Sequence, residues 1–250
     1  MEHESYKYWS KSSVYLKAIR DRALFCGLAT FYKYCRLLGF DNLKTYPKSR
    51  LYSPLKTTKP NELWCADVTI FKTKDHTKHY IHFLMDHYSK YIMGYNVCPG
   101  PSAFAIKVLL QNAYENYKPG KLQFLTDGGS ENVNTTVSDF INTPGVTIKH
   151  SIAQKDVVFS NSMVEALNKV IKHQFLFPKH ITNSNQLHAI LEQTVLIYNN
   201  GRPQMSLGGN TPKETFNGIS IDISKYTRYF NEQKALRRQL NKKNICKRCL

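Results

Sequence analysis

Long apolar runs are absent from this chain of 250 residues. No stretch approaches the roughly 20 consecutive apolar residues that a membrane-spanning helix requires. The N-terminus, Met-Glu-His-Glu-Ser-Tyr, also lacks the basic region and the apolar segment of a signal peptide. The sequence therefore predicts a cytoplasmic protein with no membrane partner.

Cysteines are few and do not complete a metal-binding pattern. The six cysteines are scattered along the chain, and without an export signal we expect them to be reduced thiols. Cys246 and Cys249 have the spacing of half a zinc site, but no second cysteine pair and no histidine spacing completes it. We interpret these two residues as exposed thiols of the tail.

Acidic residues are also scarce, because 18 Asp and Glu stand against 35 Lys and Arg, for a net charge of +17. The excess lies at the two ends: residues 1–60 and residues 225–250 each carry +8, whereas residues 61–224 carry +1. Basic segments of this kind attract polyanions and bind them in a salt-dependent way. The distribution indicates a nucleic-acid partner, and the alternative is that basic tails only keep the protein soluble.

The composition divides the chain into four parts. Residues 1–45 are predicted to form a helical, helix-turn-helix-like DNA-binding segment, and residues 46–60 a basic linker. Residues 61–217 are predicted to form the main α/β domain and the segment that follows it. Residues 218–250 are predicted to be a basic C-terminal tail, helical at first.

Two helices are expected within residues 12–39, separated at Gly27. Ser12 or Ser13 is the expected cap of the first helix, and Thr30 is the expected cap of the second. A helix-turn-helix and an ordinary helical hairpin both fit this pattern.

The main domain reads as three consecutive strands followed by alternating helices and strands. This order predicts a mixed sheet with helices on its faces. The expected strands are 62–71, 79–86, 90–98, 121–126 and 145–150, and the expected helices are 102–117, about 133–142, 160–177 and 185–200.

Three carboxylates in different settings are the candidate catalytic residues. Asp67 lies inside an apolar run that otherwise reads as a buried strand, and Asp127 follows a second apolar strand directly before Gly128-Gly129. Glu165 lies on the amphipathic helix predicted for residues 160–177. A bare acid in a strand core is costly unless a positive charge compensates it, so we expect the three acids to converge on divalent metal ions.

The helix that carries Glu165 has two distinct faces. Five apolar residues share one face and are expected to pack on the sheet: Met163, Val164, Leu167, Val170 and Ile171. The opposite face carries Glu165, Asn168, Lys169 and Lys172. This row is expected to hold a metal ion at one end and to contact a phosphate backbone along the rest, and the alternative is a solvated face with an ordinary Glu–Lys pair.

Phosphodiester chemistry explains why three acids are needed. Two divalent ions about 3.5–4 Å apart stabilise both the attacking and the leaving oxygen, and Mg²⁺ prefers carboxylate oxygens while keeping several waters. In this interpretation Asp67 bridges both metal ions, and Asp127 and Glu165 each hold one. Water or a DNA 3′-hydroxyl is the nucleophile, so no Ser, Cys or His nucleophile is required.

Five motifs in order make the chain resemble the DDE transposases of bacterial insertion sequences, which carry an integrase core and are kin to retroviral integrases. Three of them surround the acids: residues 64–69 (WCADVT), 125–131 (LTDGGSE) and 159–169 (FSNSMVEALNK). The other two are residues 85–95 (MDHYSKYIMGY) and 198–212 (YNNGRPQMSLGGNTP). Lys172 matches a basic position of the family, seven residues after the glutamate.

The resemblance implies an RNase H-like fold with a mixed five-stranded sheet flanked by helices. It implies a transposase that nicks the ends of a mobile element. Strand transfer then follows by attack of the freed 3′-hydroxyl on target DNA, in DNA integration and recombination. It further implies two Mg²⁺ ions, for which Mn²⁺ substitutes, and a homo-oligomer on DNA at the nucleoid. Asn168, Lys169, Lys172 and Arg202 are the expected DNA contacts.

Three departures from the family pattern are visible. Thirty-seven residues separate Asp127 from Glu165, slightly more than is usual, which a loop insertion around 151–158 would absorb. Ser160 stands where many relatives have Asp. The chain lacks a leucine-zipper-like heptad run, a part that relatives often obtain from an upstream reading frame, so an upstream-frame partner or fusion is expected.

Two rival functions remain open, namely an RNase H-like nuclease without strand transfer and a non-catalytic DNA-binding relative. Other polar residues near the predicted sheet are interpreted as structural. Asp86 is expected to cap a turn, His150 to be a satisfied residue at a strand end, and Asp75, Asp139 and Asp156 to lie in turns or at the surface.

Overall fold

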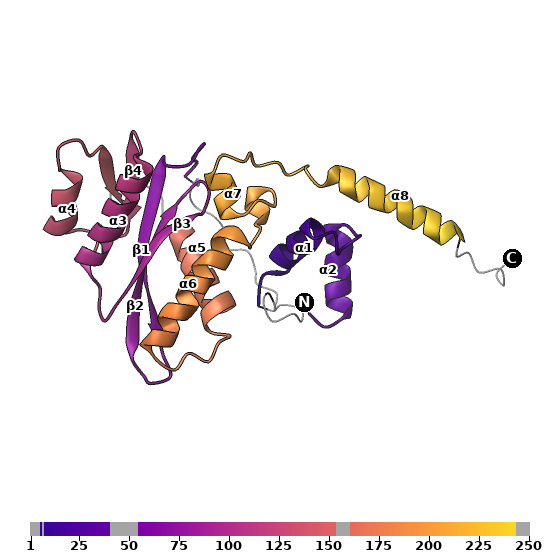
Figure 1. Cartoon of the computed structure of the whole chain (residues 1–250), viewed down its shortest axis with the longest axis horizontal. Coiled ribbons are helices and arrows are strands. Elements are labelled where there is room, and N and C mark those ends of the chain that lie inside the picture. The colour runs from indigo at the N-terminus through magenta and orange to yellow at the C-terminus, as the bar shows by residue number, and fades with distance from the viewer. Residues whose placement is uncertain (1–5, 7, 41–54, 154–160, 244–250) are drawn as a thin grey trace. The chain divides into compact units, whose positions relative to one another are not determined.

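The computed structural model describes residues 6, 8–40, 55–153 and 161–243 (Figure 1). It contains two compact units. We call Ser49–Gly201 with Thr211–Ile219 the sheet unit, and Met1–Lys48 with Arg202–Asn210 and Ser220–Leu250 the terminal unit. Most of the predicted linker lies outside the described residues, as do Asp156, Ser160, Cys246, Cys249 and most of the predicted insertion at 151–158.

The sheet unit is built on one five-stranded mixed sheet, as predicted, in the order β3-β2-β1-β4-β5. The strands are β1 (Leu63–Lys72), β2 (Lys78–Asp86), β3 (Ile92–Cys98), β4 (Leu122–Thr126) and β5 (Ile148–Ile152). The first three strands form an antiparallel meander, whereas β4 is parallel to β1 and β5 is parallel to β4. The predicted bounds of β5, 145–150, begin and end too early. Residues 143–147 form the turn and loop that precede the strand.

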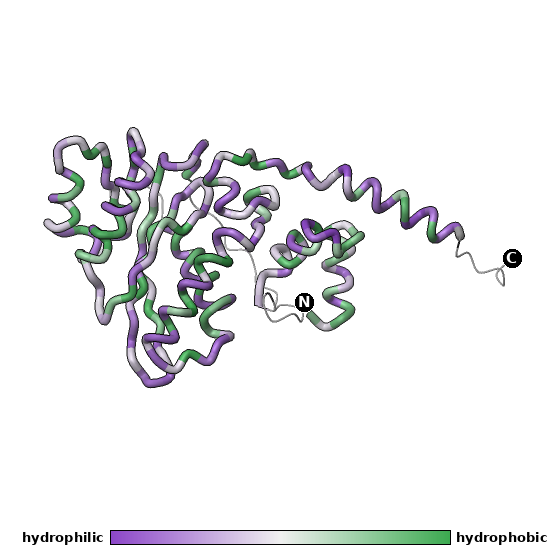
Figure 2. The backbone as a smooth tube through the Cα atoms, in the orientation of Figure 1, coloured by the Kyte–Doolittle hydropathy of each residue, from purple (hydrophilic) through white to green (hydrophobic). Residues whose placement is uncertain are grey.

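One face of the sheet is covered by α3 (Ala103–Tyr117) and α4 (Thr135–Ile141) (Figure 1). Ser102 caps α3 by accepting a hydrogen bond from the backbone N–H of Ala105, the arrangement that an N-cap serine provides. The side chains of Trp64, Phe124 and Leu110 are fully buried in the core beneath these helices. Figure 2 shows hydrophobic residues, in green, along the strands and helices that supply this core.

The helices α5 (Ser162–Ile171) and α6 (Ser184–Asn200) follow β5 in the chain. α5 packs against β1, and α6 packs against β3. Asn199 of α6 ties that helix to the sheet, since its side-chain amide donates to the carbonyl of Ile92 and accepts from the N–H of Ile92. The short helix α7 (Pro212–Phe216) begins with a capping box formed by Thr211 and Glu214.

The helix predicted over residues 160–177 is not uniform. The α-helical part ends at Ile171, and residues Lys172–Leu176 form a π-helical segment, η1. Phe175 and Leu176 are buried there. A π-helical turn changes the angular position of the residues after it, and here it accompanies the burial of these two apolar side chains.

The terminal unit combines segments from both ends of the chain. It contains α1 (Lys11–Arg20), α2 (Leu28–Leu37), the 3₁₀ turn η2 (Met205–Leu207) and α8 (Thr227–Lys243). The predicted caps were wrong: Ser10 caps α1 by accepting from the N–H of Ser13, and α2 begins at Leu28 after Gly27. Residues 202–210 belong to this unit, although the predicted domain bounds assigned them to the main domain, 61–217.

None of the helices in the described part of the chain is long and apolar enough to cross a membrane.

Candidate active site

The parallel pairing of β1 and β4 brings Asp67 and Asp127 to the same place. The two strands pair from Leu63 opposite Gln123 to Cys65 opposite Leu125. Continuing this register by two residues places Asp67 opposite Asp127, just beyond the last pair. Adjacent strands are about 4.8 Å apart, and the charge of Asp127 acts on Asp67, so the two carboxylates belong to one site at the end of β4.

The helix α5 is held against this point of β1 by two asparagine side chains. The amide of Asn161 donates to the carbonyl of Ala66 at 2.9 Å, and the amide of Asn168 donates to Oδ2 of Asp67 at 2.7 Å. Both asparagines are buried. These bonds place Glu165, one turn before Asn168 on the same helix, near the two aspartates.

The electrostatic environment of Asp67 links it to the other two acids. Burial raises the pKa of Asp67 to about 6, and the negative charges of Asp127 and Glu165 contribute to the increase. The backbone N–H of Val68 and the amide of Asn168 act in the opposite direction, because hydrogen bonds stabilise the carboxylate. A carboxyl group with a pKa near 6 is poised to gain a positively charged ligand.

The turn after β4 orients Asp127 in a similar way. Oδ1 of Asp127 accepts hydrogen bonds from the N–H of Gly129 at 3.1 Å and from the side-chain amide of Asn132 at 2.6 Å. Asn132 has no exposed surface. Both bonds engage one carboxylate oxygen, so the other oxygen is available to a ligand.

Three buried asparagines thus support the acids, and they share a further property. The side-chain oxygens of Asn132, Asn161 and Asn168 are buried and have no hydrogen-bond partner among the residues that the structure describes. Leaving a buried polar atom without a partner costs about 1–3 kcal/mol. The amide groups are held in this orientation because each N–H contacts an acid or the backbone beside it.

No ion pair joins Asp67, Asp127 or Glu165 to a lysine or arginine among the residues that the structure describes. Within those residues there is also no group of three or more His, Cys, Asp and Glu side chains arranged to hold a metal ion as it stands. The site is therefore a set of like charges that are near enough to interact but are not closed around a common point.

The expected DNA contacts are placed differently from one another. Lys169 is exposed and Lys172 is half-buried, in agreement with the predicted polar face of the helix. Asn168 is only 6% exposed and donates a hydrogen bond to Asp67, so its predicted contact with DNA stays a prediction. Arg202 is 5% exposed and belongs to the terminal unit, so its side chain presents little surface to a DNA phosphate.

The acids that were interpreted as structural have structural partners. Asp86 is fully buried and accepts hydrogen bonds from the N–H of Asn61 and from both the N–H and the hydroxyl of Ser89. Burial raises its pKa. Asp75 bonds Thr73 and Thr77 in the hairpin turn between β1 and β2. His150 bonds the hydroxyl of Thr126 at 2.8 Å.

Sequence reasoning missed the supporting roles of Asn132 and Asn161. Asn132 follows Asp127 by five residues and belongs to no helical or strand period. The only available signal was its place directly after the Asp-Gly-Gly turn. Asn161 lies within the motif around Glu165, but the sequence gives no indication that its partner is a carbonyl of β1.

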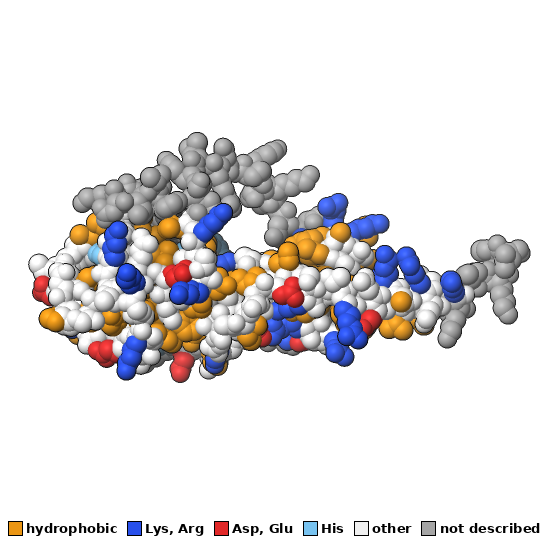
Figure 3. Space-filling view, turned by 90° about the horizontal axis from the view of Figure 1, so that it is seen from above, with side chains coloured by type: hydrophobic (Ala, Val, Ile, Leu, Met, Phe, Trp, Pro, Cys, Tyr) orange, Lys and Arg blue, Asp and Glu red, His pale blue; other side chains and the backbone are white. Residues whose placement is uncertain are grey.

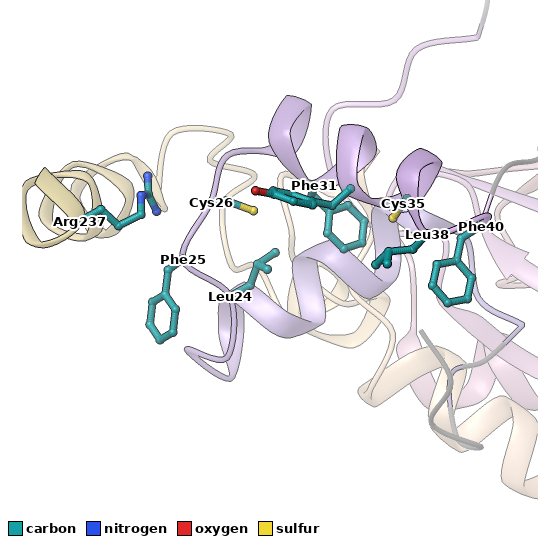
Figure 4. A pocket seen from close by; sticks show the side chains of 9 residues that line it. Leu24, Phe25, Cys26, Phe31, Cys35, Leu38, Phe40 and Arg237 are labelled. Carbon is teal, nitrogen blue, oxygen red and sulfur yellow. The ribbon is translucent and has the colours of Figure 1, made fainter. Parts of the chain in front are cut away.

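A large apolar pocket lies away from the acids, within the terminal unit. Its volume is about 780 Å³, and Figure 4 shows Phe31, Cys35 and Leu38 beside it, with Arg237 of α8 on another side. Its lining residues are mostly apolar and include the thiols of Cys26 and Cys35.

Solved structures with a similar fold are retroviral integrases. The catalytic core domain of the HTLV-2 integrase in complex with magnesium (trimeric form) has a TM-score of 0.51 and 20% identity, covering 64% of this chain and 99% of that one. The simian T-cell lymphotropic virus intasome in complex with PP2A regulatory subunit B56 gamma has a TM-score of 0.56 and 14% identity, covering 81% and 74%. At these identities the likeness establishes the RNase H-like fold of the integrase core.

Two family models described as integrase core domains match residues 57–155 and residues 146–212, which together are more than half of the chain. The fold and these matches define an integrase-core protein. Its curated relatives include the putative transposase InsK for insertion sequence element IS150 of Escherichia coli, 25% identical over 66% of this chain and 57% of the relative. The transposase for IS904 of Lactococcus lactis is 25% identical over 64% and 62%. The chain belongs to the integrase-core family, and these curated relatives are named as transposases of bacterial insertion sequences.

The matched stretch spans about three fifths of the length of these two relatives.

Proposed function

We propose that this chain is a DNA transposase that nicks the ends of an insertion sequence and joins the freed 3′-hydroxyl to a target phosphodiester. The proposal is supported by the register of β1 with β4, which brings Asp67 level with Asp127, and by the effect of the charges of Asp127 and Glu165 on the pKa of Asp67. The relatives' names as transposases support the same activity.

A divalent metal ion, Mg²⁺ or Mn²⁺, fits the chemistry of this donor set. Mg²⁺ is commonly held by one or two carboxylates, several waters and a substrate phosphate. A pair such as Asp67 and Asp127 therefore suffices for one ion without a closed cage, and we assign Glu165 with Asp67 to a second. When bound, such ions stabilise the charge that develops on the attacking and leaving oxygens.

The residues of this chain prepare the site in three ways. Asn168 engages one oxygen of Asp67 and Asn132 engages one oxygen of Asp127, which fixes the orientation of both carboxylates. Exposed Lys169 and half-buried Lys172 lie along α5, and we assign them to phosphate contacts that hold the DNA backbone. Gly128 adds no side chain directly after Asp127, whereas the space beside Gly129 is filled by the carboxylate of Glu131.

We assign the catalytic steps to this chain, and we propose that a further segment contributes to recognition of the element ends. The matched relatives are longer than the matched stretch, and we propose an upstream-frame partner or fusion for recognition of the element ends. We also propose that the protein works as a homo-oligomer on DNA, because two ends must be joined to one target.

A strand-transfer assay tests the proposal. Wild-type protein is incubated with Mg²⁺ or Mn²⁺ and a duplex that carries the inverted repeats flanking the gene, and nicked and joined products are separated. Asp67→Asn should abolish both products while leaving DNA binding within about twofold, and Asp75→Asn is the matched control in the hairpin turn. Nicking without joining would support the nuclease alternative, and no metal-dependent product from wild type would refute the proposal.

A further inference from the structure

The two basic ends of the chain are parts of one folded unit. Tyr15, Leu16 and Ile19 of α1 form a buried cluster against Tyr229 and Phe230 at the start of α8. The rings of Tyr15 and Phe230 are stacked with centroids 6.2 Å apart. The hydroxyl of Tyr229 donates to the carbonyl of Leu24 at 3.1 Å. The first turn of α8 is thus anchored on the N-terminal helices.

Beyond this anchor, α8 is covered by little protein. From Asn231 to Lys242 every residue is exposed except Gln233, which is half-buried. Isolated helices of fewer than about 12–15 residues are only marginally stable in water. The length of this stretch therefore contributes little to its helical stability. A partner that covers it would stabilise it.

The exposed stretch carries a row of like charges. Lys234, Arg238 and Lys242 follow one another at spacings of four residues, which places them on one face of the helix. Like charges at this spacing destabilise a helix by a few tenths of a kcal/mol per pair. The only acid of α8, Glu232, is already paired with Arg228 at 2.9 Å. No carboxylate of α8 therefore compensates the row.

The row points away from the anchor. At about 100° per residue, the three basic residues centre roughly 130° from the side formed by Tyr229, Phe230 and Gln233. Arg237 lies closer to the anchored side, where it lines the apolar pocket beside Cys26 (Figure 4). Figure 3 shows Lys and Arg side chains along this helix up to its C-terminal end.

We infer that the Lys234–Arg238–Lys242 face of α8 is a binding site for the phosphate backbone of duplex DNA, separate from the acids of the sheet unit. This inference rests on the proposed function, since it takes DNA as the substrate. The row spans about 12 Å along the helix, which suits successive phosphates beside a groove. The contact is independent of base sequence, because it engages only backbone charge. Anchoring of α8 on α1 makes the N-terminal helices and this face approach DNA as one body.

Equilibrium DNA binding of the full chain in EDTA tests the inference. The variant Lys234→Gln/Arg238→Gln/Lys242→Gln is compared with wild type on a duplex of unrelated sequence at several salt concentrations. A control variant, Lys118→Gln/Lys121→Gln/Lys149→Gln, removes the same charge from exposed lysines of the sheet unit. Far-ultraviolet circular dichroism confirms that both variants are folded.

The expected result is a decrease of about 2.7 in the slope of log K against log salt for the α8 variant, which corresponds to three phosphate contacts. Its affinity at low salt should fall at least about tenfold, and the control should stay within about threefold of wild type. Equal losses in the two variants would overturn the inference, because they would reflect net charge alone. Metal-dependent nicking by wild type is measured in parallel, so failure of the α8 site and failure of the proposed function give different results.

Discussion

The side-chain amide of Asn168 donates a hydrogen bond to Oδ2 of Asp67 at 2.7 Å, and it does so from a buried position on α5. This bond lowers the pKa of Asp67 against the larger effect of burial. It also fixes the orientation of a carboxylate that the proposed function assigns to metal binding. Asn168 is therefore a positioning residue with a measurable influence on Asp67.

Replacing Asn168 with alanine tests this influence. Without the donor, the pKa of Asp67 should rise further above 6, because the charged form loses a hydrogen bond. Metal-dependent nicking should fall about 10–100-fold, as for the loss of other groups that orient metal ligands, and the acidic limb of its pH profile should move to higher pH. The control is Asn112→Ala, which changes an exposed asparagine of α3. An unshifted profile would show that Asn168 serves only packing.

Asp67 should destabilise the fold at neutral pH in the absence of metal. Its pKa is 3.8 as an ordinary aspartate and about 6 in the folded chain, so the folded state binds more protons between these values. Stability therefore falls as pH rises through this window, and the penalty is complete above about pH 6. Two pKa units correspond to roughly 3 kcal/mol, which partial exposure reduces to about 1–2 kcal/mol.

The variant Asp67→Asn measures that penalty by urea unfolding in EDTA. It should be about 1–2 kcal/mol more stable than wild type at pH 7.5 and equally stable near pH 4. Asp75→Asn should show no gain, because hydrogen bonds from Thr73 and Thr77 lower the pKa of Asp75. Equal stability of Asp67→Asn and wild type at both pH values would contradict the prediction.

Divalent cations should reverse this penalty in the wild-type chain. A metal ion that binds only the folded state raises the free energy of unfolding by about 2.7 kcal/mol at 100 times its Kd. The Tm of wild type should therefore rise with Mg²⁺ or Mn²⁺, whereas Asp67→Asn and Asp127→Asn should respond much less. The measurement is differential scanning fluorimetry over a metal titration, and an identical rise in all three proteins would locate the metal elsewhere.

Substitution of Asp86 should lower stability and leave nicking largely unchanged, whereas substitution of Asp67 should raise stability and abolish nicking. Both residues are carboxylates in the same sheet. The change Asp86→Ala leaves the N–H of Asn61 and both donors of Ser89 without their acceptor. The cost should be about 2–4 kcal/mol, with little change in the nicking rate of the protein that remains folded. Chemical unfolding and a nicking assay, normalised to folded protein, separate the two effects. A rate loss as severe as in Asp67→Asn would give Asp86 a catalytic role.

The sequence predicted the sheet and its helices because each element has a clear period. The apolar runs around Asp67 and before Asp127 became β1 and β4, and the expected helix at 102–117 became α3. The family motifs also indicated which three acids would converge. The register of β1 with β4 could not be derived locally, since it joins segments about 60 residues apart in the chain.

The errors arise where tertiary contacts override local preference. A helical period places Asn168 on the polar face with Glu165, but it does not show that Asn168 is buried there by its hydrogen bond to Asp67. The same period continues through residue 177, whereas burial of Phe175 and Leu176 accompanies a π-helical turn after Ile171. Nothing in a local pattern indicates that residues 202–210 fold with the two ends of the chain.

The ladder between β1 and β4 is only three residue pairs long, from Leu63–Gln123 to Cys65–Leu125. Trp64 and Phe124 form its middle pair and have no exposed surface. A change of volume at either ring would alter how far apart the two strand ends stand, and hence the gap in which the reacting phosphate must sit. Substitutions in the buried core can therefore change the catalytic rate of such an enzyme even when every residue that contacts the substrate is unchanged.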